Sequence, residues 1–337
     1  MPRLATRTEW PERVQRQLMA NRPVSLLEHA VSMVISEPIA DWCERWLGST
    51  PTTALFASDK ISAVIGLRLA DGREVVVKSR QPQERLAGCV AVQRHLWSAG
   101  FPCPEPLAGP APLGDLVATA ERYVVGGTPL VRDADAPRRY ADLLARQVAL
   151  AAAIAERVPT LEPPPYWARW DHELAATWPP DPNVDLNAPA GPDELDAVGE
   201  RARRRLTRPH GLPDVIGHCD WESQNLGWRD GELLVAHDWD SLARRPEAAI
   251  AGMTSLMYPS TGTTNEPATL QESESFLRAY QRARGCAFSA EEREIAWAAS
   301  VWIGGWKAKK AALYGDAGVV RTGFLPSASE RLRRAGA

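Results

Sequence analysis

Acidic side chains gather in two short segments in the second half of the chain, each directly beside an apolar run. The first is Gly217-His218-Cys219-Asp220-Trp221-Glu222-Ser223-Gln224-Asn225-Leu226, and the second is Leu234-Val235-Ala236-His237-Asp238-Trp239-Asp240. A carboxylate at the end of a buried strand costs desolvation free energy unless a cation, a metal ion or a hydrogen-bond donor compensates it. Several such acids close in sequence indicate a metal site or a general base.

The elements that must position these residues differ between the two halves of the chain. The first half is rich in predicted strands: Ile61–Leu69 and Glu74–Val77 form a hairpin joined at Asp71-Gly72, a strong turn signal. Glu84–Ala99 is predicted to be a helix that ends at Gly100. The prolines that follow Gly100 forbid further helix. Leu116–Val125 is predicted to form one or two more strands.

The second half is predicted to be mainly helical. Arg138–Val158 is rich in Ala and Leu, Glu194–Leu206 is basic along one side, and most of 269–334 has helical spacing. Both acidic segments fall in a stretch of short buried strands or loops, Val215–Gly227 and Leu233–Asp238. The residues that could do chemistry are therefore expected at strand ends within a helical part.

Composition excludes several classes of protein. Of the 337 residues, 45% are hydrophobic and 24% are charged, which is typical of a globular protein and excludes wholesale disorder. A net charge of −3 argues against a nucleic-acid partner. The sequence contains no apolar run of about 18 residues, so we expect no membrane span. The five cysteines form no CxxC pair, so we expect no zinc ribbon or disulfide framework, and a cytoplasmic location.

The pattern His218-x-Asp220-x4-Asn225, followed 13 residues after Asn225 by Asp238-Trp239, resembles the catalytic signature of the aminoglycoside phosphotransferase and choline kinase-like family. Val75-Val76-Val77-Lys78 resembles the lysine-bearing strand of that family's small lobe, and the resemblance covers roughly residues 50–315.

The resemblance implies an α+β, bilobal protein-kinase-like fold with a small antiparallel sheet and a mainly helical second lobe. Residues 1–125 would hold an N-terminal extension, read as short helices over 1–50, and the small nucleotide-binding lobe. Residues 126–337 would form the helical catalytic and substrate lobe.

The same resemblance implies roles for the three polar residues of the two acidic segments. Phosphoryl transfer depends mainly on positioning the reactants and neutralising charge. Asp220 would orient, and could deprotonate, the acceptor hydroxyl, while Asn225 and Asp238 would hold Mg²⁺ against the nucleotide phosphates. Oxygen ligands alone suit Mg²⁺, which takes its other ligands from water and phosphate.

The nucleotide, ATP or GTP, would also be bound by residues of the first half. Lys78 would contact the α- and β-phosphates, and Ser58 could contact a phosphate where protein kinases use a glycine-rich loop. The hinge around Glu121 and Tyr123 would offer backbone groups to the adenine edge. Without the resemblance, Lys78 could simply extend to the surface and Ser58 could be an ordinary turn residue.

The sequence departs from the family pattern in the region of the predicted helix. The family usually places there a glutamate that pairs with the lysine, but Gly88–Gln93 contains no acid, which leaves Glu84 as a candidate partner for Lys78. Cys219 follows the motif histidine where glycine is common. Arg245-Pro246-Glu247 stands where the family often shows Asp-Pro followed by an anchoring acid.

Three functions remain open at this point. The leading one is a kinase, acting as a monomer or homodimer, that phosphorylates a small hydroxyl-bearing substrate. The missing helix glutamate favours a second, a catalytically weak or inactive nucleotide-binding protein of the same fold. The third is a metal-dependent hydrolase that would use His218, Asp220, His237 and Asp238 as ligands. In the kinase, His218 would be structural and fix the loop by hydrogen bonds.

Overall fold

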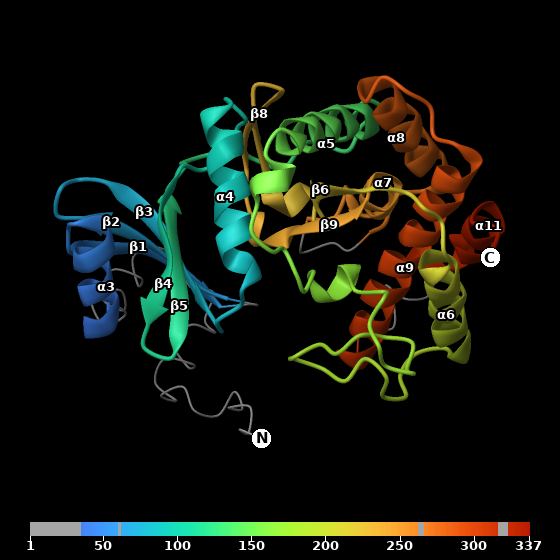
Figure 1. Cartoon of the computed structure of the whole chain (residues 1–337), viewed down its shortest axis with the longest axis horizontal. Coiled ribbons are helices and arrows are strands. Elements are labelled where there is room, and N and C mark those ends of the chain that lie inside the picture. Colours follow the sequence, from blue (N-terminus) through green and yellow to red (C-terminus); the bar gives the residue numbers. More distant parts are fainter. Residues whose placement is uncertain (1–34, 60–61, 262–265, 316–322) are drawn as a thin grey trace. The chain divides into compact units, whose positions relative to one another are not determined.

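The computed structural model describes residues 35–59, 62–261, 266–315 and 323–337, which form two compact units (Figure 1). The first unit comprises the described residues up to Val90 together with Pro104–Val125. The second comprises Ala91–Cys103 and the chain from Gly126 onward. The helices predicted over 1–50 fall largely outside the described residues. The fold is α+β, as expected, with an antiparallel sheet in the first unit and mainly helices in the second.

The first unit is built on a five-stranded antiparallel sheet with strand order β1-β2-β3-β5-β4. The predicted hairpin at Asp71-Gly72 is confirmed, and Gly72 adopts the positive φ of 87° that the turn requires. The strands are β1 (Pro51–Asp59), β2 (Ala63–Leu69), β3 (Glu74–Arg80), β4 (Pro106–Leu113) and β5 (Leu116–Arg122).

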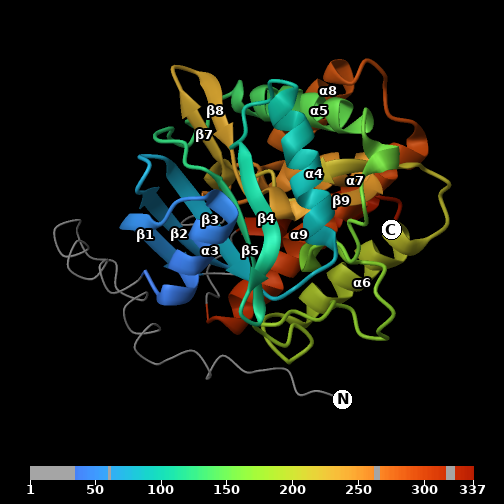
Figure 2. The same cartoon turned by 60° about the vertical axis from the view of Figure 1, so that its left-hand side comes forward.

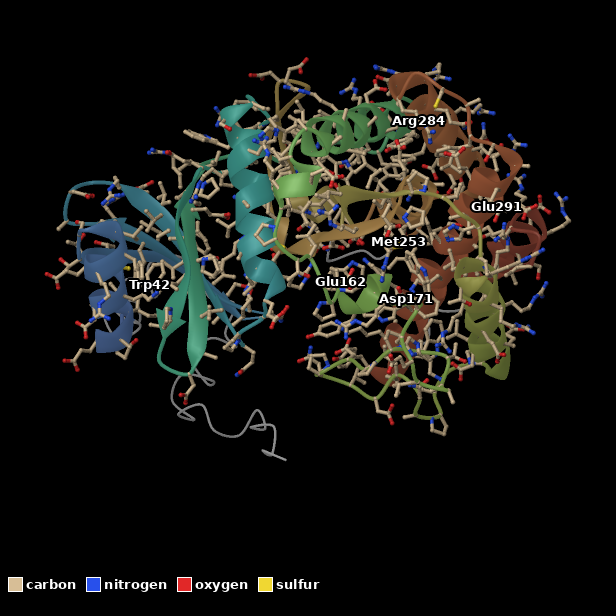
Figure 3. All side chains as sticks on the ribbon, in the orientation of Figure 1. Trp42, Glu162, Asp171, Met253, Arg284 and Glu291 are labelled. Carbon is tan, nitrogen blue, oxygen red and sulfur yellow. The ribbon has the colours of Figure 1, made fainter. Side chains whose placement is uncertain are left out.

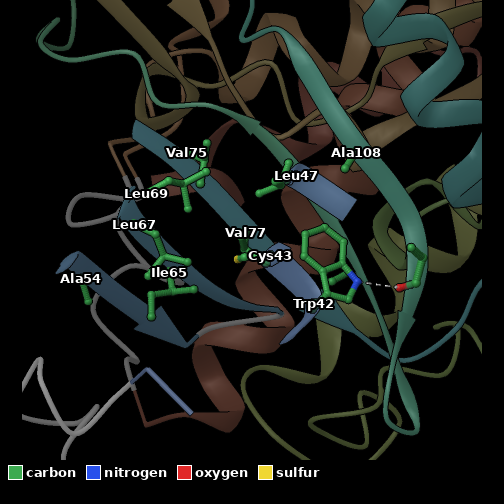
Figure 4. Close-up of a cluster of buried hydrophobic side chains, with 13 residues drawn as sticks. Trp42, Cys43, Leu47, Ala54, Ile65, Leu67, Leu69, Val75, Val77 and Ala108 are labelled. Atoms are coloured by element: carbon green, nitrogen blue, oxygen red, sulfur yellow. Dashed lines mark hydrogen bonds between the residues drawn. The ribbon is translucent and has the colours of Figure 1, made fainter. Parts of the chain in front are cut away.

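One face of this sheet carries the core of the unit, closed by helix α3 (Glu37–Leu47) (Figure 4). Trp42 of α3 is buried there, and its indole Nε1 donates to the Ala111 carbonyl at 3.4 Å. Val75 and Val77 of β3 belong to this core. Because side chains alternate along a strand, Val76 and Lys78 lie on the opposite face.

The helix α4 (Arg85–Ser98) and the turn after it connect the units in sequence, and residues 91–103 belong to the second unit. The reason is local hydrogen bonding: the Gly100 carbonyl accepts from Arg146, and the Pro102 carbonyl accepts from the Ala236 N–H at 2.8 Å. Residues 91–103 are therefore part of the second unit, although they precede the last strands of the first.

The second unit is an assembly of helices around α7 and α9. The α7 residues Ala248 to Met257 are all buried, including Met253 (Figure 3). A Cβ added at Gly252 would lie 2.0 Å from the carbonyl oxygen of Ala296 on α9, so glycine allows the two backbones to touch. Helices α5 and α8 pack side by side (Figures 1 and 2). The helices are α5 (Ala136–Ala152), α6 (Asp193–Thr207), α7 (Glu247–Met257), α8 (Leu270–Ala283), α9 (Ala290–Leu313) and α11 (Leu325–Arg334).

Two short two-stranded antiparallel sheets complete the second unit and carry both acidic segments. Strand β6 (Asp214–His218) pairs with β9 (Leu242–Pro246), and β7 (Leu226–Arg229) pairs with β8 (Glu232–Ala236). The first acidic segment links β6 to β7, and the second follows β8. None of the helices in the described part of the chain is both long and apolar enough to cross a membrane.

Candidate active site

His218 ties the two acidic segments together at the end of β6. Its Nδ1 accepts from the backbone N–H of Asp220 at 3.2 Å, so the ring proton is on Nε2, which lies 3.0 Å from the His237 carbonyl and donates to it. The rings of Trp221 and Trp239 meet the imidazole edge-on, each with a centroid distance of 5.4 Å. A buried histidine with both nitrogens engaged in this way is a structural residue.

Asp220 and Asn225 form a clasp across the loop after β6. The Asn225 Nδ2 donates to the Asp220 carboxylate Oδ2 and to the Asp220 backbone carbonyl, both at 2.8 Å. The one-turn helix η4 (Ser223–Asn225) holds the amide in this position. With Nδ2 committed to Asp220, the Asn225 Oδ1 remains the atom with which this side chain would bind a cation.

Asp238 lies directly after β8 in a backbone conformation that is unusual for a residue other than glycine. Its φ and ψ are 67° and 44°, in the left-handed region, where such conformations often mark functional sites. The N–H of the preceding residue, His237, donates to the Asn225 carbonyl at 2.8 Å. The structure therefore brings together Asp220, Asn225 and Asp238, which the sequence predicts for one site.

The pKa of Asp220 is raised well above its usual range. The largest cause is burial of the carboxyl, followed by the nearby negative charge of Glu222, with a smaller contribution from Asp238. Lys307 and the hydrogen bond from Asn225 act in the opposite direction. A base with a raised pKa is better matched to proton transfer near neutral pH.

Lys307 is a residue of this site that the sequence reasoning missed. Its Nζ on α9 forms an ion pair with the carboxylate of Glu222, whose side chain is 2% exposed. The second carboxylate oxygen of Glu222 accepts from Gln224 Nε2 at 2.9 Å. The signal in the sequence was Glu222 itself, since an acid in a buried loop requires a cation from elsewhere.

Trp167 of the second unit lies against the same loop and is held by two further tryptophans. The indole Nε1 of Trp167 donates to the Cys219 carbonyl at 2.9 Å, immediately before Asp220. The rings of Trp167 and Trp306 are 6.0 Å apart, and Trp302 Nε1 donates to the Trp167 carbonyl at 2.7 Å. Trp167 is half-buried, so part of an aromatic surface next to the catalytic loop is accessible.

In the first unit, Lys78 forms an ion pair with Glu121 of β5, at 3.1 Å. Glu84, the partner considered from the sequence, is exposed just before α4. Ser58 pairs with Val64, which pairs with Lys78, so Ser58 and Lys78 share a row and a face of the sheet. Ser58 is exposed near the end of β1.

Glu121 and Tyr123 lie where β5 ends. Glu121 lies within β5, and its side chain forms the ion pair with Lys78. The N–H of Tyr123 donates to the Glu74 carbonyl at 3.0 Å. The Tyr123 ring packs against Phe56 of β1, with centroids 5.4 Å apart.

Asn225 and Asp238 fit the requirements of Mg²⁺ better than those of a transition metal. Both offer oxygen atoms, and two protein ligands are sufficient for an ion that also takes water and phosphate oxygens. Within the described ranges, no group of three or more His, Cys, Asp or Glu side chains could hold a metal ion. The hydrolase alternative, which needs His218 as a ligand, also conflicts with the hydrogen bonds of that ring.

A small antiparallel sheet with a buried lysine, followed by a helical unit with an Asp–Asn loop, is the arrangement that the resemblance to kinase-like phosphotransferases implies. The model of the phosphotransferase enzyme family matches residues 53–286, more than half of the chain. The chain belongs to this family. No curated protein matches the chain significantly.

Solved structures of similar fold come from the same class of enzyme. A thermostable mutant of aminoglycoside phosphotransferase APH(4)-Ia is 18% identical, with a TM-score of 0.55, covering 88% of this chain and 99% of its own. The amicoumacin kinase hAmiN, in complex with AMP-PNP, Ca²⁺ and Ami, is 13% identical, with a TM-score of 0.53 and coverages of 81% and 90%. Spectinomycin phosphotransferase APH(9)-Ia, in complex with ADP and spectinomycin, is 11% identical, with a TM-score of 0.50 and coverages of 88% and 92%.

Proposed function

We propose that this protein is a small-molecule kinase that transfers the γ-phosphate of ATP or GTP to a hydroxyl group of its substrate, with Mg²⁺ as cofactor and in the cytoplasm. The observation that carries the proposal is the clasp between Asp220 and Asn225, with Asp238 attached through His237. Family membership and the nucleotide complexes of similar structures support it.

Asp220 would act on the acceptor. Its carboxylate accepts a hydrogen bond from the substrate hydroxyl, which orients a lone pair of the hydroxyl oxygen toward the γ-phosphorus. As the new O–P bond forms, the bond from the γ-phosphorus to the β–γ bridging oxygen breaks, the nucleoside diphosphate leaves, and the hydroxyl proton passes to Asp220. The hydrogen bond from Asn225 fixes the carboxylate orientation throughout.

Asn225 and Asp238 would hold Mg²⁺ through Oδ1 and a carboxylate oxygen. The bound ion would neutralise charge on the nucleotide phosphates. Lys78 would contact the α- and β-phosphates, and Ser58, on the same face of the sheet, is placed to contact a phosphate as well. The backbone after β5, including the Tyr123 carbonyl, would meet the base.

One observation favours an inactive nucleotide-binding protein as the second candidate. Helix α4, RLAGCVAVQRHLWS, contains no acid to pair with the lysine. The ion pair between Lys78 and Glu121 weakens that argument, because the lysine has an acidic partner from another element.

The test is a phosphate-transfer screen over aminoglycosides, macrolides, amino alcohols and sugars with ATP and GTP, comparing wild type with Asp220→Asn. The kinase predicts transfer to at least one hydroxyl compound, lost in the variant. Nucleotide binding without transfer to any compound supports the second candidate, and absence of nucleotide binding contradicts both.

A further inference from the structure

The carboxylate that meets Lys78 is supplied by the sheet. Glu121 Oε1 and Lys78 Nζ are 3.1 Å apart, and the residues are only 7% and 9% exposed. In the pairing of β3 with β5, Val76 lies opposite Glu121 and Lys78 lies opposite Thr119. Lys78 and Glu121 are therefore diagonal neighbours on one face, at a separation that long side chains bridge.

Three other described acids of the first unit are either exposed or paired with an arginine. Helix α4 contains none, and Glu84 before it is exposed. Glu74, at the far end of β3, pairs with Arg68, and Glu105 pairs with Arg122. Of the three ion pairs named here, the one between Lys78 and Glu121 is the one in which both side chains are nearly inaccessible.

We propose that Glu121 is the residue that positions Lys78 for nucleotide binding, in place of an acid on the helix; this rests on the proposed function. A lysine side chain has four rotatable bonds, and its ordering costs about 2 kcal/mol of rotamer entropy. A fixed carboxylate offsets that cost before the nucleotide binds. The ion pair orients the ammonium group, which would contact the phosphate oxygens in the proposed complex.

The arrangement has a consequence for how the site is assembled. Both partners sit on neighbouring strands whose register is set by the sheet, so their separation does not depend on the position of α4. The pairing of β3 with β5 fixes the position of Lys78 relative to Glu121. The ion pair therefore forms without any movement of α4.

The experiment is a double-mutant cycle read by the affinity for Mg-AMP-PNP and by kcat and KM for the nucleotide. The single variants are Lys78→Met and Glu121→Gln, and the third protein carries both. Glu105→Gln is the matched control, because Glu105 forms an ion pair with Arg122 on the same strand as Glu121.

If Glu121 acts through Lys78, Lys78→Met weakens nucleotide binding tenfold or more, and Glu121→Gln weakens it about five- to twentyfold, mainly in KM. Adding Glu121→Gln to Lys78→Met then has no further effect, and Glu105→Gln binds as wild type. The inference is overturned if the affinity losses of the two single variants multiply in the double variant, or if Glu121→Gln binds the nucleotide as wild type does. Either result leaves the proposed role of Lys78 intact. Wild-type affinity of Lys78→Met instead overturns the proposed role of the lysine.

A relocated acid covers the case in which Glu121→Gln folds poorly. Thr119 lies directly opposite Lys78 in the sheet, on the same face. The pair of substitutions Thr119→Glu and Glu121→Thr keeps one carboxylate next to the lysine and should recover binding to within about threefold of wild type. Recovery supports positioning by charge. A folded relocation variant that binds no better than Lys78→Met contradicts it.

Discussion

Lys307 of α9 forms an ion pair with Glu222, which lies in the loop after β6, two residues from Asp220. The negative charges of Glu222 and Asp238 both raise the pKa of the Asp220 carboxyl, and the positive charge of Lys307 acts against them there. Lys307 therefore compensates the negative charge of the loop that carries Asp220.

Removal of this cation should impair both stability and turnover. Lys307→Met leaves Glu222 buried without its cation, which we expect to cost about 2–4 kcal/mol of unfolding free energy and to lower kcat. The double variant with Glu222→Gln removes the charge from both partners and should regain at least half of the lost stability. Urea denaturation of the three proteins measures this. A double variant that is less stable than Lys307→Met contradicts the account.

The contact between α7 and α9 predicts a sharp effect at one glycine. Gly252→Ala places a methyl group 2.0 Å from the backbone oxygen of Ala296, so a helix must shift, at a cost of about 2–4 kcal/mol. The control is Gly285→Ala, where no atom lies within 4 Å of the added Cβ and only the positive φ of 81° opposes the change. That variant should lose about 1 kcal/mol. Equal losses in the two variants would show that the helices are less tightly packed.

Thiol reactivity should distinguish one cysteine from the other four. Cys43, Cys89, Cys103 and Cys219 are buried, whereas Cys286 is exposed. Burial also raises the pKa of the Cys43 thiol to about 11, so little thiolate is present at neutral pH. A native titration with an aromatic disulfide reagent at pH 7.5 should show one fast thiol, which Cys286→Ser removes. Two or more fast thiols would be incompatible with this burial.

Glu272 should contribute stability that depends on pH. The hydrogen bonds from Arg132 are the main cause that lowers its pKa to about 2, from an ordinary value of 4.5, and the cap of α8 at Thr269 adds to this. A lowered folded-state pKa stabilises the fold above about pH 4.5, and the contribution is lost as the pH falls toward 2.

Glu272→Gln should therefore be about 1 kcal/mol less stable than wild type at pH 7, with the difference shrinking below pH 4.5. Chemical denaturation at pH 7, 5 and 3.5 measures the difference between the two proteins. A gap that is constant over this range would mean that the charge of Glu272 is not responsible.

Local signals predicted much of the fold and the site. The Asp71-Gly72 turn identified its hairpin because two residues decide that geometry. The sequence places Asp220 and Asn225 close together in one loop, but it did not predict the hydrogen bonds between them. The strand β4 was missed since its prolines suggested only the absence of helix, although Pro is tolerated at a sheet edge, where β4 lies.

The pairings that join distant parts of the chain could not be predicted. Glu222 and Lys307 are 85 residues apart, and nothing near Lys307 marks it as different from the other lysines of α9. The side chain of Glu121 meets Lys78 only because β5 inserts between β3 and β4, a strand order that the sequence did not specify. Such contacts depend on topology, which a single sequence constrains weakly.

The most direct measurement of the central claim compares Asp220→Asn with wild type in two assays on one preparation: phosphoryl transfer to an accepted hydroxyl compound, and binding of Mg-AMP-PNP. Loss of a positioned base predicts a fall in kcat of about 10²–10⁴-fold. Nucleotide affinity should stay within about threefold of wild type, because Asp220 is assigned to the acceptor. Undiminished transfer by the variant would contradict the assignment of Asp220 and the mechanism built on it.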